Sequence, residues 1–367
     1  MQDYSTYIDF VKYSTRSLPF GNPDKANGID WGDFYHFCLR QGIAGIVFEG
    51  LERSGLQVTQ KVLFEWIGTV EHIKKSNRVI DKRCHQISRF WEQQGYRSCI
   101  LKGQANAMMY PRPELRSPGD IDIWVWKEDD ERVAEIIRIA QREAPNGHYS
   151  LHHVTMPVFS DTSVEVHYRP VFLDNWWKDK RLQCYVDQVR KEQFNHQITL
   201  SDGKTAICRL TDDFNAVFLL LHMWHHLLST RNNFKQLIDY YYLLKRGVSD
   251  VQRSQIGRLF NELGVLKYAQ GIMWVEHNIL GLEEQYLLVK PDEKIGQLLL
   301  NETLHYGEKR ADGSKMKTLV GRVTNNLHLF WHFPSPVLIA PAYLVWHQWW
   351  KYKMHIKLKH HYNLIVR

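Results

Sequence analysis

The chain has 367 residues, of which 44% are hydrophobic and 24% are charged, as in ordinary globular proteins. This composition excludes a chain that is mostly disordered, collagen-like or of low complexity, and the five scattered cysteines, which form no CxxC pair, argue against a disulfide framework or a cysteine zinc site. The net charge of +7 arises from the last 55 residues, which carry eight Lys or Arg and no acidic residue. A basic character of the whole chain, and with it general nucleic-acid binding, is therefore not indicated.

Residues 1–94 are predicted to be helical, because their apolar residues recur at spacings of three and four. Gly95 suits the end of the last of these helices. The N-terminus has no basic segment followed by an apolar run, so we expect no signal peptide and a cytoplasmic location.

Residues 95–203 form the second predicted region, a small α/β core. The pattern predicts strands at 96–101, 120–126, 152–159 and 163–168, with helices at 104–110 and 129–144. Among these, residues 120–126 (DIDIWVW) alternate most strictly. The expected fold class is α+β: a small mixed sheet flanked by helical regions at both ends.

Residues 204–367 are predicted to be helical again, without an internal repeat. No stretch reaches the about 18 uninterrupted apolar residues that a membrane span needs. The segment 337–361 is rich in Trp, Lys and His, and two interpretations stay open for it: a buried terminal helix with a basic end, or a helix that lies on a membrane surface.

Asp120 and Asp122 are the central candidates for chemistry. Side chains at i and i+2 of a strand share one face, so both carboxylates point the same way and repel each other unless a cation lies between them. An acid-x-acid pair is expected about four times by chance in a chain with 40 acidic residues, so its position after a Pro-Gly turn in an apolar strand is what favours a Mg²⁺ site.

Glu165 and His167 share one face of the strand 163–168. If that strand lies beside the first, Glu165 adds a third carboxylate, and three carboxylates can hold two metal ions that drive an in-line displacement at phosphorus. His167 is then expected to orient the carboxylate or to carry a proton. The alternative is that both residues line an exposed sheet face.

A strand-to-helix junction supplies Lys102, Gly103 and Gln104. Glycine lets the backbone approach a phosphate, and Lys102 and Arg116 would neutralise its charge, unless they are ordinary surface cations.

Several further polar residues have competing interpretations. His222 and His226 have a zinc-compatible i, i+4 spacing, but their apolar flanks favour buried or pocket-lining histidines. One of His152 and His153 should face the site around Glu165. Lys235 and Asp239 are also at positions i and i+4 of a predicted helix, a spacing that indicates an ordinary surface or packing pair.

The runs LKG, YPRPELRSPGDIDIWV and VEVHYRP, followed by LLLHMWHHL and LIDYYYLL, resemble the uncharacterised nucleotidyltransferase family of the polymerase-β-like superfamily. The arrangement is similar to that of aminoglycoside and lincosamide nucleotidyltransferases, and it extends over residues 62–244. The resemblance implies that residues 95–203 are a nucleotidyltransferase core.

Site roles follow from this resemblance by position. Asp120 and Asp122 would be the metal-binding pair, and Glu165 would complete the metal site and accept the proton of the attacking hydroxyl. Gly103 and Gln104 would form the phosphate turn. Arg116 would match the basic residue that precedes the acidic pair.

The expected function is a Mg²⁺-dependent transfer of a nucleoside monophosphate from an NTP, with ATP as the expected donor, to a small-molecule or glycan hydroxyl. Lys102, Gly103, Gln104, Arg116 and His167 would contact the nucleotide. The turn reads Gly-Gln where the superfamily has Gly-Ser, and 17 positions separate Gly103 from Asp120. The Gly-Gln turn and the aromatic-rich C-terminal segment leave an alternative open: a catalytically degenerate module that binds a nucleotide or a protein.

Overall fold

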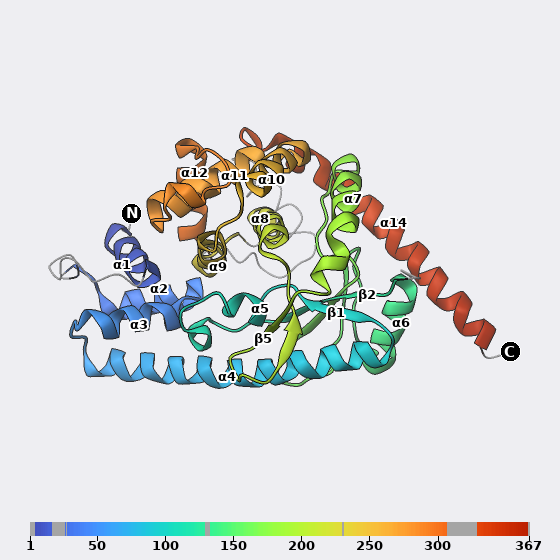
Figure 1. The fold of residues 1–367 in the computed structure, drawn as a ribbon, viewed down its shortest axis with the longest axis horizontal. Helices are drawn as coiled ribbons and strands as arrows, with labels where there is room; N and C mark the ends of the chain where they lie inside the picture. The colour runs from blue at the N-terminus through green and yellow to red at the C-terminus, as the bar shows by residue number, and fades with distance from the viewer. Residues whose placement is uncertain are drawn as a thin grey trace. The chain divides into compact units, whose positions relative to one another are not determined.

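The computed structural model describes residues 4–16, 26, 28–128, 133–229, 231–306 and 329–365. The chain divides into two compact units, each assembled from segments that are distant in the sequence. The first unit consists of Met1–Val79, Asn106–Pro118 and Asp212–Arg322, and the second of Ile80–Ala105, Gly119–Thr211 and Val323–Arg367. The long helix α4 (Gln60–Gln93) contributes residues to both units (Figure 1). The sequence-based boundaries at residues 94 and 203 stay a prediction.

The first unit is helical. Its regular elements are α1 (Ser5–Arg16), α2 (Trp31–Gln41), α3 (Ala44–Ser54), the start of α4, η2 (Pro113–Leu115), α8 (Asp212–Ser229), α9 (Phe234–Lys245), α10 (Asp250–Leu263), α11 (Leu266–Trp274), η3 (Val275–Ile279), η4 (Glu284–Tyr286) and α12 (Glu293–Leu304). Capping boxes begin α9 at Asn233 and α10 at Ser249, where side chains satisfy the first backbone N–H groups. The apolar faces of these helices supply the core: Phe34 packs against Phe10 and Trp66, with all three rings buried.

The second unit contains the sheet. Its strands are β1 (Arg97–Ile100), β2 (Ile121–Trp126), β3 (His153–Thr155) and β4 (Val164–His167), in the order β1-β2-β4-β3. The β2–β4 pair is parallel, and the β1–β2 and β3–β4 pairs are antiparallel. A separate hairpin joins β5 (Gln197–Thr199) to β6 (Ala206–Cys208).

Both faces of β2 are buried. Ile121, Ile123 and Val125 lie on one face, and Asp122, Trp124 and Trp126 lie on the other. Phe194 covers the second face, with ring centroids 4.8 Å from Trp124 and 5.5 Å from Trp126. Asp122 therefore projects from a strand whose position is fixed by packing on both sides.

The helices of the second unit are the end of α4, the start of α5 (Gln104–Ala107), α6 (Val133–Glu143), α7 (Trp176–Gln193) and α14 (Pro334–Ile365). Residues 129–132, the predicted start of α6, lie outside the described residues. α14 is one continuous helix that runs to the C-terminal end (Figure 1) and contacts α6.

The expected fold class is confirmed: the chain is α+β, with a small mixed sheet and helices at both ends. Two predicted elements are shorter than expected. The helix predicted at 104–110 stops at Ala107, because residues before Pro111 turn away from helical geometry, and the strand predicted at 152–159 ends before Pro157, which has no N–H for a ladder. None of the described helices is long and apolar enough to cross a membrane.

Candidate functional site

The candidate site lies on the face of the sheet that carries Asp122. The parallel register of β2 and β4 places Asp122 directly beside Glu165, and the antiparallel register of β4 and β3 places His167 opposite His153. Adjacent strands are about 4.8 Å apart, so these four side chains share one surface. The structure thus brings together predicted residues from three strands.

Asp122 is the most enclosed carboxylate of the site, with 3% of its side chain exposed. Its Oδ1 atom lies 3.0 Å from Nε2 of His167. Its Oδ2 atom is buried and forms an ion pair with the ammonium of Lys102, 3.1 Å away. Burial alone would raise the pKa of Asp122, but Lys102 and His167 lower it, so the carboxylate is charged near neutral pH.

Lys102 forms ion pairs with both aspartates of the predicted metal site: its Nζ atom lies 3.1 Å from Asp122 Oδ2 and 3.6 Å from Asp120 Oδ1. Burial would lower the pKa of Lys102, but Asp122 and then Asp120 raise it. Lys102 therefore occupies the space between the two aspartates as a permanent cation, and not the surface position that sequence alone left open.

His167 is the second cation of the site. Burial would lower the pKa of His167, but the hydrogen bond to Asp122 and the carboxylate of Glu165, whose Oε2 lies 3.7 Å from Nε2, raise this pKa to about 9. The ring is protonated near neutral pH in this arrangement. With Lys102, it gives two positive charges against the three carboxylates of Asp120, Asp122 and Glu165.

Glu165 lies between the carboxylate and histidine parts of the site. Burial would raise the pKa of Glu165, but His167 and His153 lower it. His153 Nδ1 is 3.6 Å from Glu165 Oε2, and burial followed by the charge on His167 lowers the pKa of His153 to about 4. Near neutral pH, Glu165 is ionised and His153 is neutral.

The expectation that one of His152 and His153 faces the site is met by His153, and His152 also lies near it. The ring of His167 is 5.3 Å from that of His153 and 5.6 Å from that of His152. Two groups have donor atoms within 4.8 Å of one another: Asp122, Glu165 and His167, and His152, His153 and His167. Asp120 belongs to neither group, and its predicted role as a metal ligand stays a prediction.

The Gly-Gln turn is only partly directed at the site. Gly103 has φ = 64°, which favours glycine and explains why this residue stands at the junction. Gln104 is 5% exposed, and its side-chain amide donates to Oδ1 of Asp81. The Oδ2 atom of Asp81 accepts from Ser201 Oγ at 3.0 Å. No sequence pattern indicated Asp81 or Ser201, which belong to α4 and the loop after β5.

Arg116 lies in the helical unit and is 3% exposed. Its guanidinium donates to both oxygens of Asp239, at 2.7 Å each, and the Tyr110 hydroxyl donates to the same carboxylate at 2.5 Å. The interpretation of Lys235 and Asp239 as an ordinary surface or packing pair is therefore wrong for Asp239, which is buried and neutralised by Arg116. Lys235 instead donates to the carbonyl of Pro118.

His222 and His226 are partly buried on α8, with their Nε2 atoms 3.1 Å apart. The ring of His222 stacks on Phe218. Neither residue belongs to a described group of three or more potential metal ligands. This environment agrees with histidines that line a helix interface.

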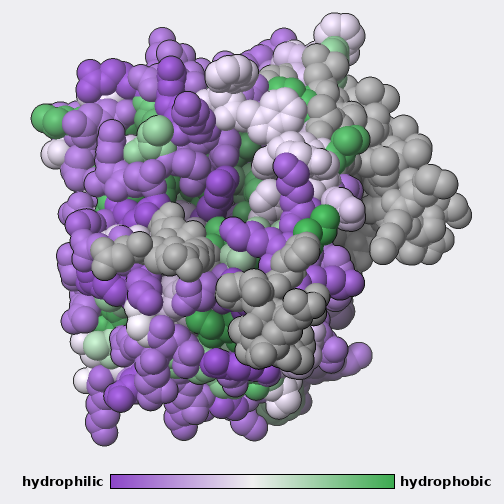
Figure 2. Space-filling model, turned by 90° about the vertical axis from the view of Figure 1, so that its right-hand side faces the viewer, coloured by the Kyte–Doolittle hydropathy of each residue, from purple (hydrophilic) through white to green (hydrophobic). Residues whose placement is uncertain are grey.

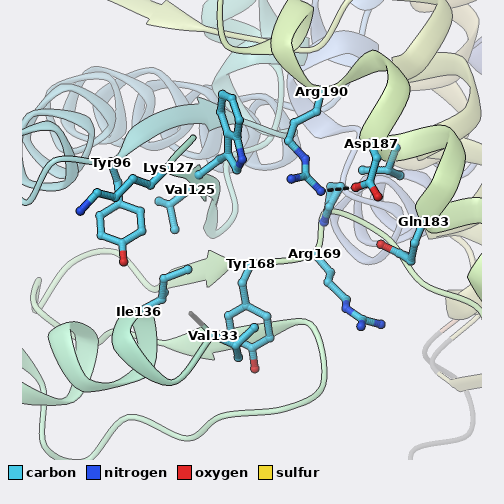
Figure 3. A pocket seen from close by; sticks show the side chains of 13 residues that line it. Tyr96, Val125, Lys127, Val133, Ile136, Tyr168, Arg169, Gln183, Asp187 and Arg190 are labelled. Atoms are coloured by element: carbon cyan, nitrogen blue, oxygen red, sulfur yellow. Dashed lines mark hydrogen bonds and ion pairs between the residues drawn. The ribbon is translucent and has the colours of Figure 1, made fainter. Parts of the chain in front are cut away.

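A separate pocket of about 270 Å³ lies at the carboxyl ends of β2 and β4 (Figure 3). Tyr96 and Lys127 border one side, and Arg190 points toward Asp187, its ion-pair partner, on the other (Figure 3). None of the carboxylates of the candidate site lines this pocket. Trp126 in its wall is four residues from Asp122, about 13 Å along the strand.

The profile of a family described as uncharacterised nucleotidyltransferases matches residues 27–281. Among curated proteins, none matches the chain. One solved structure, an antigenic nucleotidyltransferase-like protein from Paracoccidioides brasiliensis, is 11% identical over 54% of this chain and 92% of its own, with a TM-score of 0.36.

We expect Arg116→Ala to lower the free energy of unfolding by about 3–5 kcal/mol, because it leaves the buried Asp239 carboxylate without its counter-charge. Urea denaturation measures this loss. The double variant Arg116→Met with Asp239→Leu removes both charges and should retain most of the stability. A loss below about 1 kcal/mol in Arg116→Ala, the value typical of exposed ion pairs, would contradict the structural role of this pair.

Proposed function

We propose that this chain, which belongs to the uncharacterised nucleotidyltransferase family, transfers a nucleoside monophosphate from an NTP to a hydroxyl-bearing acceptor and releases pyrophosphate. The observation that carries the proposal is the register that sets Asp122 beside Glu165, with Asp120 two residues before Asp122. The expected donor is ATP, and the acceptor is a small molecule or a glycan.

The residues fit a divalent cation. Three carboxylates against Lys102 and His167 leave one net negative charge, and the oxygens of these carboxylates are the available donor atoms. Hard oxygen donors of this kind suit Mg²⁺. When bound by Asp120, Asp122 and Glu165, two Mg²⁺ ions would supply charge neutralisation for the phosphates and activation of the attacking hydroxyl.

The chain's own side chains would then divide the remaining tasks. Lys102, which pairs with both aspartates, would contact the phosphates as a fixed cation. Glu165, ionised and 28% exposed, would accept the proton of the acceptor hydroxyl. His167 would hold Asp122 and Glu165 in place through its ring nitrogen. Contacts of Gly103, Gln104 and Arg116 with the nucleotide stay predictions.

A second candidate function has one observation in its favour. Lys102 already neutralises both aspartates, so the cation that a nucleotidyltransferase needs has a competitor within the chain. A catalytically degenerate module that binds nucleotide or protein would use the same face without turnover. Release of pyrophosphate by the purified chain distinguishes the two functions.

The location is also part of the proposal. All five cysteines are free thiols, in agreement with the cytoplasm, where thiols stay reduced.

We propose further that α14 contacts an anionic membrane surface from the cytoplasmic side. Val345, Trp349, Tyr352 and Ile356 follow at spacings of four, three and four on one helix face, and they are 72%, 51%, 65% and 38% exposed.

This exposed stripe combines aromatic rings with positive charge. The Nζ atom of Lys353 lies 3.7 Å from the ring centroid of Trp349, and α14 contains no acidic residue. The other side of α14 packs within its unit, where Tyr343 stacks on Phe172. Figure 2 shows a face of the molecule that is mainly hydrophilic, with hydrophobic residues at scattered positions. Trp, Tyr and Lys on one helix face are typical of interfacial helices.

The catalytic proposal predicts that Asp120→Asn and Asp122→Asn each lower NTP-dependent pyrophosphate release by about a hundredfold or more. Each variant lacks a carboxylate that would bind the Mg²⁺ ions, and these ions would neutralise the negative charge of the transition state. Glu143→Gln, a change of an exposed carboxylate on α6, is the matched control and should keep full activity. Undiminished release by the Asp122→Asn variant would refute the assignment.

The membrane proposal predicts that the chain sediments with vesicles containing phosphatidylglycerol, and that Trp349→Ala with Tyr352→Ala weakens this binding by about tenfold. Trp177→Ala, which removes another exposed tryptophan of the same unit, should bind as the wild type does. Equal binding of the wild type to uncharged phosphatidylcholine vesicles, or full binding by the double variant, would contradict the role of α14.

A further inference from the structure

One end of the candidate site is built from nitrogen donors. The strand order β1-β2-β4-β3 places Asp122 on one side of β4 and His153 on the other, so the polar surface changes from carboxylates to imidazoles across the sheet. His152, His153 and His167 offer ring nitrogens that lie within 4.8 Å of one another. The nucleotidyl-transfer proposal gives His152 and His153 no task.

The histidine rings are positioned in the manner of metal ligands. His152 stacks on Phe172, with centroids 4.5 Å apart, and its Nδ1 atom lies 3.3 Å from Ser150 Oγ. Its Nε2 atom is therefore directed at His153 Nδ1, 2.8 Å away. A hydrogen bond on one ring nitrogen that fixes the other toward a shared point is the usual support of a metal-bound histidine.

A buried nitrogen without a partner provides a second, independent observation. His167 is 6% exposed, and its Nδ1 atom has no hydrogen bond within the described part of the chain, whereas Nε2 contacts Asp122. In the protonated ring, Nδ1 is a buried N–H group without an acceptor, which is costly. A metal ion that displaces this proton would give the nitrogen a partner. Glu165 Oε2, 3.6 Å from His153 Nδ1, supplies an oxygen at the same place.

We propose that His152, His153 and His167, with Glu165 beside them, form a transition-metal site of the Zn²⁺ class at the β3 edge of the sheet. Imidazole nitrogens favour Zn²⁺, Co²⁺ or Ni²⁺, whereas Mg²⁺ prefers an all-oxygen environment. The site differs from the proposed Mg²⁺ site at the aspartate pair, because most of its donor atoms are imidazole nitrogens and its histidines lie on or beside β3 and β4. Its occupation does not depend on the proposed nucleotidyl transfer, because it is defined by binding of the metal alone.

Calorimetric titration of the full, tag-free chain with Zn²⁺ after chelator treatment tests the proposal. The wild type should bind one Zn²⁺ that excess Mg²⁺ does not displace, and His152→Ala with His153→Ala should weaken this binding by at least about tenfold. His222→Ala with His226→Ala removes the other close histidine pair and is the matched control; it should bind as the wild type does.

Titration with Co²⁺ supplies a readout of the donor atoms, since nitrogen ligands change its visible absorption relative to the hydrated ion. His153→Gln, which retains size and polarity, covers the case in which the double variant does not fold. Wild-type affinity in both histidine variants of this site, or a loss only in the α8 control, would overturn the proposal. Asp120→Asn should abolish turnover and keep Zn²⁺ binding. The nucleotidyl-transfer proposal and the Zn²⁺ proposal can therefore fail independently of each other.

Discussion

Asp122 and Glu165 are neighbours on two parallel strands, and the repulsion between these carboxylates is the constraint around which the site is organised. Asp122 is 3% exposed, so water cannot screen its charge. Two like charges at this spacing persist only when cations compensate them. Lys102 from the end of β1 and His167 from β4 provide this compensation within the chain.

The rest of the second unit fixes this arrangement. β2 is buried on both faces, and Phe194 packs on Trp124 and Trp126 beside Asp122, so the strand that carries the carboxylate cannot shift without disturbing the core. The short strand β3 then extends the polar surface toward the histidines. A carboxylate part and an imidazole part thus meet at Glu165, which contacts both His153 and His167.

The alternation of DIDIWVW and VEVHY was sufficient to predict β2, β4 and the faces of Asp122 and Glu165, because a strand's period of two leaves no freedom in side-chain direction. Their pairing could only be assumed, since register depends on contacts between segments that are distant in sequence. The same limit explains why Lys102 was expected at a phosphate and lies on the aspartates. It also explains why Arg116 was not matched with Asp239, 123 positions away.

For α7, β5 and β6, the sequence pattern was too weak to predict the element. α7 buries only Leu182, Val186 and Gln193 of its 18 residues, so it has little apolar periodicity to detect. The strands β5 and β6 have three residues each, and no strand was predicted there from the sequence. The sequence-based resemblance to the uncharacterised nucleotidyltransferase family is confirmed by the profile match over residues 27–281.

The most direct test of the account is a thermal-shift titration with ATP, GTP, CTP and UTP, each with and without Mg²⁺, on the wild type and on Asp122→Asn. The account predicts that one NTP stabilises the wild type only with Mg²⁺, by about 2.7 kcal/mol at a hundred times its Kd, and that Asp122→Asn loses this stabilisation. No stabilisation by any NTP, or an equal shift in the variant, would contradict a metal–nucleotide site at Asp122 and Glu165.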